Sequence, residues 1–276
     1  MRLIADSGST KVDWRVIYRD GTIREITTPG INPFFQTPDQ ISLELENNVK
    51  SKTGDDVSEI HFYGAGVTGD KTEVLKNCLL KVFPGATAGA YTDMLAAARA
   101  LCGNNPGIAA ILGTGANSCF YDGEKIADNV PACGFILGDE GSGAVLGRKL
   151  VSDYLKRELP VDLEKLFDDR YNLDYNSIIE KVYRQPFPNR YLAAFSLFLS
   201  ENRSHPYIIK LLRNSFSEFI TRNILKYDYK KYSMNLVGSV AFHYRDIIEE
   251  VAGNYGVTTG KVLSSPIEGL VSFHKY

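Results

Sequence analysis

The chain has 276 residues, a formal net charge of −2 and a hydrophobic fraction of 44%, values typical of a globular protein with two domains of ordinary size. The absence of a basic stripe argues against a nucleic-acid partner, and no apolar run approaches the ~20 residues that a membrane-spanning helix requires. The N-terminus lacks the charged segment and apolar core of a signal peptide, so we expect a cytoplasmic protein.

The first part of the chain predicts a three-stranded meander followed by alternating helices and strands. Asp20-Gly21 marks the turn between the second and third strands, and Thr37-Pro38 has the residue types of a helix N-cap and a first helical position. The expected strands cover residues 2–6, 12–18, 22–28, 60–63 and 86–91, and the expected helices cover residues 38–49, 71–82 and 94–101.

The same three-stranded opening recurs after residues 104–107, which have the composition of a linker. The expected strands here cover residues 108–112, 118–121, 125–128, 236–240 and 261–263, and the expected helices cover residues 144–157, 241–252 and 267–273. Apolar residues at i, i+3 and i+4 predict a helical insertion over about 160–230. We expect one domain over 1–105 and a second over 106–266, with the terminal segment 267–276 packed back on the first.

The turn after the first strand has residue types that suit phosphate binding. It reads Asp6-Ser7-Gly8-Ser9-Thr10-Lys11. Glycine and serine let backbone amides approach phosphate oxygens, and Lys11 adds a positive charge for a terminal phosphate. Asp6, at the end of the strand, can hold Mg²⁺ directly or through water. By itself, this turn is equally compatible with a serine-rich hairpin that a carboxylate caps.

Two further glycine turns favour the phosphate interpretation. Gly113-Thr114-Gly115 follows the first strand of the second half, at the place that corresponds to the first turn, and Gly238-Ser239 follows a late strand. Two facing glycine loops can hold one polyphosphate between two domains. The repeat therefore points to ATP as the ligand.

These motifs resemble those of the BadF/BadG/BcrA/BcrD-type branch of the actin-like, Hsp70-like and sugar-kinase ATPase superfamily. Within it the chain is most similar to N-acetylglucosamine kinases and related amino-sugar kinases. The resemblance covers essentially the whole chain and implies an α/β protein of two ribonuclease-H-like domains, with ATP and sugar in the cleft between them. It also implies Mg²⁺ as a cofactor and a homodimer, since the family often dimerises.

Each motif of the family has a counterpart in this chain. The first phosphate motif is matched by Asp6, Gly8, Thr10 and Lys11, with Ser7 and Ser9 in place of the usual glycines, and the second by Gly113, Thr114 and Gly115. The adenosine motif is matched by Gly238 and Ser239, and the terminal helix motif by Ile267-Glu268-Gly269-Leu270. The resemblance implies that the phosphate and adenosine motifs bind ATP and that Asp6 binds the metal.

The resemblance also implies roles for several polar residues. Asn32 and Asp139 bind the sugar, Asn117 lies near the sugar or the phosphates, and Asp93 accepts the proton of the sugar hydroxyl. Each residue also has a local interpretation: Asp93 as a helix N-cap, the two asparagines as turn residues, and Asp139 with Glu140 as acids at a helix start. Whether Glu140 takes part is left open.

Three functions are compatible with these motifs. The first is ATP-dependent phosphorylation of N-acetylglucosamine or a related sugar such as glucosamine or N-acetylmuramic acid. The second is an ATPase activator of an iron–sulfur dehydratase or reductase, although Cys119 and Cys133 show no convincing cluster pattern. The third is a non-catalytic nucleotide switch, which would not need Asp93 or Asn32.

Overall fold

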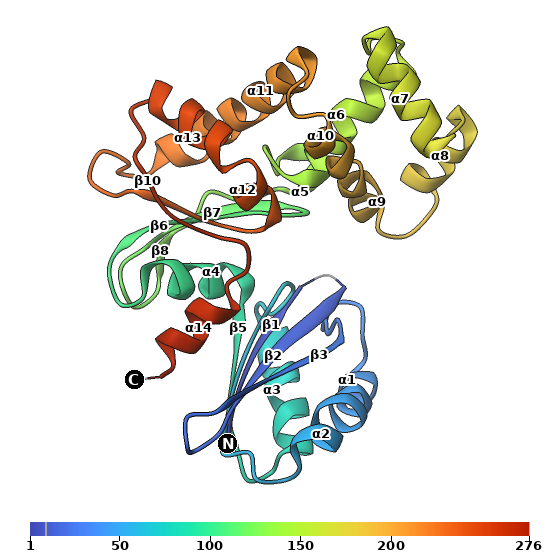
Figure 1. Cartoon of the computed structure of the whole chain (residues 1–276). Helices are drawn as coiled ribbons and strands as arrows, with labels where there is room; N and C mark the ends of the chain where they lie inside the picture. Colours follow the sequence, from blue (N-terminus) through green and yellow to red (C-terminus); the bar gives the residue numbers. More distant parts are fainter. Residues whose placement is uncertain (9, 276) are drawn as a thin grey trace. The chain divides into compact units, whose positions relative to one another are not determined.

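The computed structural model describes residues 1–8 and 10–275, and the chain divides into two compact units (Figure 1). Unit 1 comprises Met1–Asn104 together with Ser265–Tyr276, and unit 2 comprises Asn105–Ser264. Among the described residues, no helix combines the length and the apolar character that crossing a membrane requires.

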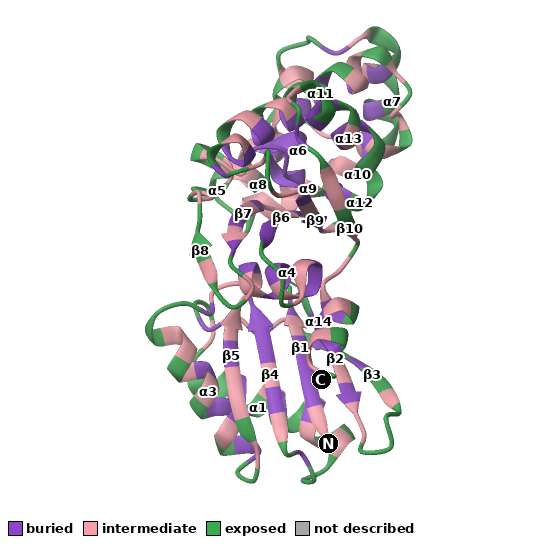
Figure 2. Ribbon diagram, turned by 90° about the vertical axis from the view of Figure 1, so that its left-hand side faces the viewer, coloured by how far each residue is buried: buried purple, intermediate pink, exposed green. Residues whose placement is uncertain are grey.

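Unit 1 is built on a mixed five-stranded sheet with the order β3-β2-β1-β4-β5. Its strands are β1 (Arg2–Ser7), β2 (Lys11–Ile17), β3 (Ile23–Pro29), β4 (Glu59–Gly64) and β5 (Thr87–Thr92). The first three strands form the expected antiparallel meander, and β4 and β5 continue the sheet parallel to β1. Figure 2 shows buried residues concentrated in β1 and β4, the central strands of this sheet.

The helices of unit 1 follow the expected order. They are α1 (Pro38–Leu45), the π-helix η1 (Glu46–Lys50), α2 (Ser51–Thr53), α3 (Asp70–Val82), α4 (Asp93–Cys102) and α14 (Ile267–Phe273). Thr37 caps α1 in a capping box with Gln40, as its residue type predicts. Trp14 is fully buried, packs edge-on against Phe62 and donates a hydrogen bond from Nε1 to Thr28 Oγ1 at 3.0 Å.

Unit 2 repeats the sheet of unit 1 with the order β10-β9-β6-β7-β8. Its strands are β6 (Gly107–Leu112), β7 (Ala116–Tyr121), β8 (Ile126–Asp128), β9 (Met234–Val237) and β10 (Thr259–Leu263). Strands β6, β7 and β8 form an antiparallel meander, and β9 and β10 extend the sheet parallel to β6. The duplicated opening in the sequence is therefore a duplicated sheet.

The helices of unit 2 surround a large core that includes the buried residues of the insertion. They are α5 (Gly134–Leu137), α6 (Gly143–Leu155), α7 (Val161–Tyr171), α8 (Tyr175–Tyr183), α9 (Pro188–Ala194), α10 (Ser196–Glu201), α11 (Pro206–Arg222), the 3₁₀ helix η2 (Ile224–Lys226), α12 (Ser239–His243) and α13 (Arg245–Asn254). The single helix expected over 241–252 is wrong in detail, because the chain breaks between α12 and α13 at Tyr244. That side chain is buried and its hydroxyl donates to Ser196 O at 3.0 Å.

Gly147 lies where α6 packs directly on the backbone of α9, because a Cβ atom there would overlap the carbonyl oxygen of Leu192. We expect Gly147→Ala to lower the free energy of unfolding by about 1–3 kcal/mol, since overpacking must push the two helices apart. Gly253→Ala is the matched control, because Gly253 is exposed in helix α13 with open space around it. It should stabilise the protein by roughly 0.5–1 kcal/mol. Urea unfolding of both variants checks the difference, and equal effects would contradict this packing.

A cluster of polar and aromatic side chains holds the end of α14 on unit 1. Nε2 of His274 lies 2.8 Å from the Tyr63 hydroxyl, which also accepts a hydrogen bond from Arg99 at 2.8 Å. The ring of His274 stacks on that of His61 with 3.7 Å between centroids. Burial lowers the pKa of His274 to about 3, and the positive charges of His61, Arg99 and Arg2 act in the same direction.

This low pKa predicts acid destabilisation of the protein. In the unfolded chain a histidine has a pKa near ~6.5, so between that pH and about 3 only the unfolded state binds the proton. The free energy of unfolding should therefore fall as the pH falls through this window, by about 1–2 kcal/mol after discounting for partial exposure. His274→Gln should show a smaller fall than the parent from pH 7 to pH 4 in urea unfolding, and His243→Gln, at an exposed position, is the matched control. An unchanged pH dependence in His274→Gln would contradict the assignment.

Candidate functional site

The carboxyl ends of the parallel strands in unit 1 meet at one edge of its sheet. Ser7, Gly64 and Thr92 are register partners at the ends of β1, β4 and β5. The segment that follows β3 joins this edge, because Ser7 Oγ donates to Ile31 O at 2.8 Å and accepts from Ile31 N at 3.3 Å. The turn after β1, Asn32 and Asp93 are thus brought to the same edge.

Within the first phosphate turn, the described residues differ in their exposure to solvent. Gly8, Thr10 and Lys11 are exposed, whereas Ser7 is buried and uses its hydroxyl to fix the segment after β3. Ser9, the remaining residue of this prediction, lies outside the described residues. The Lys11 ammonium is paired with Asp13, with Nζ 2.8 Å from Oδ2.

Asp6 lies near two other acidic residues, Asp13 and Asp93. Burial raises the pKa of Asp6 to about 7, and the negative charges of Asp13 and Asp93 raise it further. The positive charge of Lys11 and a hydrogen bond from the Ser265 hydroxyl act in the opposite direction. Asp13, which the motif analysis did not single out, is the register partner of Asp6 across the β1–β2 hairpin. A bound cation would relieve the charge repulsion that raises this pKa.

The carboxylate of Asp6 fits a magnesium ion only as part of a larger set of ligands. Among the described residues, no group of three or more histidines, cysteines or acids is arranged to hold a metal. Mg²⁺ in phosphate-transferring sites is usually held by one or two carboxylates together with substrate phosphates and water. One half-buried carboxylate beside an exposed glycine turn is compatible with that pattern.

Asp93 is the first residue of α4, and the N-cap interpretation of it is wrong by one position. Thr92 is the N-cap, with its hydroxyl accepting from Leu95 N at 3.1 Å. The Asp93 carboxylate accepts from Met94 N at 2.8 Å. Burial raises the pKa of Asp93 and outweighs this hydrogen bond, which lowers it. A carboxylate with a raised pKa binds a proton more readily, which suits a general base.

Asn32 forms a turn and lies close to the loop after β4. Its Oδ1 accepts from Phe34 N at 2.9 Å, and its backbone amide donates to Gln36 Oε1 at 2.7 Å. The side chain packs against Gly66, where a Cβ atom would be 2.5 Å from Oδ1. The expected turn role of Asn32 is thus present, and its half-buried side chain lies at the same edge as Asp93.

In unit 2, the two predicted glycine turns lie against each other. They follow the neighbouring parallel strands β6 and β9, and a Cβ atom on Gly238 would overlap Leu112 O and lie 3.2 Å from Gly113 N. The start of α6 joins them, because Gly143 N donates to Gly113 O at 2.8 Å and Ala144 N donates to Thr114 O at 3.0 Å. Ser239 is exposed as the first residue of α12.

Asp139 faces the second phosphate turn. A Cβ atom on Gly115 would lie 3.1 Å from Asp139 Oδ2, and the carboxylate accepts a hydrogen bond from Ala116 N. Burial raises the pKa of Asp139 to about 6, although this hydrogen bond lowers it, and the negative charge of Glu140 also raises it. Asn117, one residue beyond Ala116, accepts from Ser118 N at 2.9 Å and from Asn129 Nδ2 at 3.0 Å.

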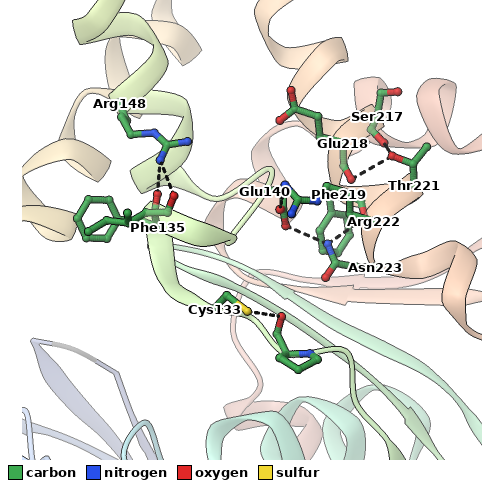
Figure 3. A network of polar contacts seen from close by, with 12 residues as sticks. Cys133, Phe135, Glu140, Arg148, Ser217, Glu218, Phe219, Thr221, Arg222 and Asn223 are labelled. Atoms are coloured by element: carbon green, nitrogen blue, oxygen red, sulfur yellow. Dashed lines mark hydrogen bonds and ion pairs between the residues drawn. The ribbon is translucent and has the colours of Figure 1, made fainter.

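Glu140, although adjacent to Asp139, is directed elsewhere (Figure 3). Its Oε1 lies 2.6 Å from Arg222 Nη1, and its Oε2 accepts from Asn223 Nδ2 at 3.2 Å. Only 6% of the residue is exposed. Both of its carboxylate oxygens are therefore bound to residues at the end of α11. Sequence patterns did not indicate these contacts.

Comparisons with known proteins show high similarity to a solved structure. No protein-family model and no curated protein matches the chain. The crystal structure of a "putative N-acetylglucosamine kinase" from Porphyromonas gingivalis is 45% identical, covers 99% of this chain and 98% of that chain, and superposes with a TM-score of 0.95.

Two more distant structures share the fold. A protein from Chromobacterium violaceum that bears the same name is 18% identical, with coverage of 99% and 98% and a TM-score of 0.70. A ROK hexokinase from Thermus thermophilus is 13% identical, with coverage of 98% and 97% and a TM-score of 0.53. These similarities confirm the expected α/β fold of the actin-like ATPases.

Proposed function

We propose a function for this chain from the premise that it belongs to the family of sugar kinases with the actin-like ATPase fold. It transfers the terminal phosphoryl group of ATP to a hydroxyl of an amino sugar, with N-acetylglucosamine as the first candidate. The observation that carries this proposal is the full-length similarity, at 45% identity, to a protein named for that substrate. Placement in the BadF/BadG/BcrA/BcrD-type branch is part of the proposal.

Residues of both units have roles in the proposed reaction. In unit 1, Gly8, Thr10 and Lys11 contact phosphate oxygens and Asp6 holds Mg²⁺, which neutralises negative charge on the phosphates. In unit 2, the turns at residues 113–115 and 238–239 bind the phosphates and the adenosine. The backbone amides of glycine turns suit this role because nothing blocks their approach to oxygen.

The sugar is bound by Asn32, Asp139 and Asn117 in this proposal, and Asp93 acts on its hydroxyl. As the hydroxyl oxygen bonds to the terminal phosphorus of ATP, the bond from that phosphorus to the oxygen of ADP breaks. The hydroxyl proton passes to the Asp93 carboxylate. Its raised pKa supports this role, because a stronger base is better matched to an alcohol.

The proposal is tested by ADP release from ATP and Mg²⁺ with a panel of sugars. N-acetylglucosamine, glucosamine and N-acetylmuramic acid are the candidates, glucose is the comparison sugar, and a reaction without sugar is the control. ADP release that depends on one amino sugar would support the proposal, and NMR of the product would identify the phosphorylated hydroxyl. ATP hydrolysis at the same rate without sugar would contradict it, and bound iron would then favour an activator ATPase.

We also propose an oligomeric state and a cellular location for the protein. The protein is a homodimer, as is frequent among the kinases that it resembles, and light scattering after gel filtration tests this. It acts in the cytoplasm, where ATP is available, and fractionation of the source cells tests this.

A further inference from the structure

Asp139 is held in a backbone conformation that non-glycine residues seldom adopt. Its φ angle is +53°, in the left-handed region. Hydrogen bonds fix the segment on both sides, because Asp139 N donates to Ala132 O at 3.0 Å and Ser142 N donates to Asp139 O at 3.0 Å. Such a conformation persists only where the surroundings enforce it.

The residue that follows supplies the remaining constraint. The carboxylate of Glu140 is almost fully buried, and a buried charge is tolerated only when it is paired and hydrogen-bonded. Arg222, the last residue of α11, supplies the ion pair, and Asn223 supplies a hydrogen bond (Figure 3). Asn223 is itself fixed, because its Nδ2 also donates to Phe219 O at 3.2 Å.

The two adjacent acids thus face different parts of unit 2. Asp139 faces the turn at Gly115 and Ala116, whereas Glu140 is bound to the end of α11. We propose that Glu140, Arg222 and Asn223 are positioning residues, which hold the Asp139 carboxylate in the orientation that binds the sugar. That Asp139 binds the sugar rests on the proposed function. How the Asp139 carboxylate is held rests on the contacts observed within unit 2.

Three variants test this proposal by kinetics. Glu140→Gln keeps the shape of the side chain and leaves no unpaired buried charge, and Arg222→Ala removes the partner. Each should raise the KM for the sugar about 10-fold or more, as is usual when a supporting contact of a site residue is removed. The KM for ATP should stay within about twofold, because the ATP contacts are untouched. Arg222→Lys, which restores the charge, should recover part of the loss.

Arg213→Ala is the matched control for Arg222→Ala. Arg213 lies on the same helix and is also ion-paired, with Nη2 2.8 Å from Glu250 Oε2, but among the described residues it forms no hydrogen bond or ion pair with residues 138–142. Its sugar KM should equal that of the parent. If Glu140→Gln and Arg222→Ala behave like Arg213→Ala, the positioning role is overturned.

A second measurement does not depend on activity. The Asp139 carboxylate accepts from Ala116 N, so the ¹⁵N shift of the Ala116 amide should titrate with the pKa of about 6. Arg222→Ala keeps both acids, and the proposal expects it to abolish or strongly reduce this titration while Arg213→Ala retains it. If the parent protein phosphorylates no sugar, the proposed function fails while this measurement still decides the positioning role. An intact Ala116 titration in Arg222→Ala would overturn the inference.

Discussion

Asp93→Asn should lower the turnover number for sugar phosphorylation by about 10²–10⁴-fold, the usual contribution of a positioned general base. An asparagine has the same shape, and its side-chain oxygen can still accept the hydrogen bond from Met94 N that the carboxylate accepts at 2.8 Å. It cannot take up the proton of the sugar hydroxyl. The fold and the binding of ATP should therefore survive while the transfer step is lost.

Turnover is measured as sugar-dependent ADP release, and ATP affinity by calorimetry in the absence of sugar. Asp70→Asn is the matched control, because Asp70 is also the first residue of a helix in unit 1 but is exposed. It should retain the parent rate. If Asp93→Asn also phosphorylates sugar at the parent rate, Asp93 is not the base, and a role confined to the start of α4 is the better interpretation.

The parts of the fold that local patterns encode were predictable. The hairpins of both sheets are formed by neighbouring strands and short turns. Local patterns do not indicate that the two glycine turns of unit 2 lie side by side, because this depends on the long-range pairing of β6 with β9. The approach of Asn32 to the edge of unit 1 depends on the Ser7 hydroxyl, which local turn chemistry does not indicate. The exact ends of strands and helices differ by a few residues because propensities are weak at boundaries.

The parts that depend on distant contacts were not predictable. Glu140 and Asn223 are 83 residues apart in sequence, and neither has a local signal for the other. The spacing of apolar residues indicates only which face of a helix is buried. It does not indicate which side chain will bind a residue at the end of a helix, such as Arg222. The proximity of Asp13 to Asp6 likewise depends on the register of one hairpin, whereas the pairing of Asp13 with Lys11 is local, two residues along β2.

Gly238→Ala should damage both the stability of unit 2 and its affinity for ATP. Gly238 has φ +123° and ψ 164°, a region that is essentially restricted to glycine, so an alanine there would cost about 1–3 kcal/mol. Its Cβ atom would also overlap Leu112 O and lie 2.8 Å from the carbonyl carbon of Leu112. Relief of that overlap displaces the adjacent turn, Gly113-Thr114-Gly115, at a further cost of about 1–3 kcal/mol.

Gly256→Ala separates these two effects. Gly256 has φ +69° with open space around it, so its substitution adds backbone strain without an overlap. Both variants should lower the melting temperature, and Gly238→Ala should lower it further. Only Gly238→Ala should also raise the KM for ATP, by about tenfold if displacement of the turn costs ~1.4 kcal/mol of binding. Equal KM values in the two variants would show that the turns after β6 and β9 can move without disturbing nucleotide binding, and the assignment of these two turns to ATP would then fail.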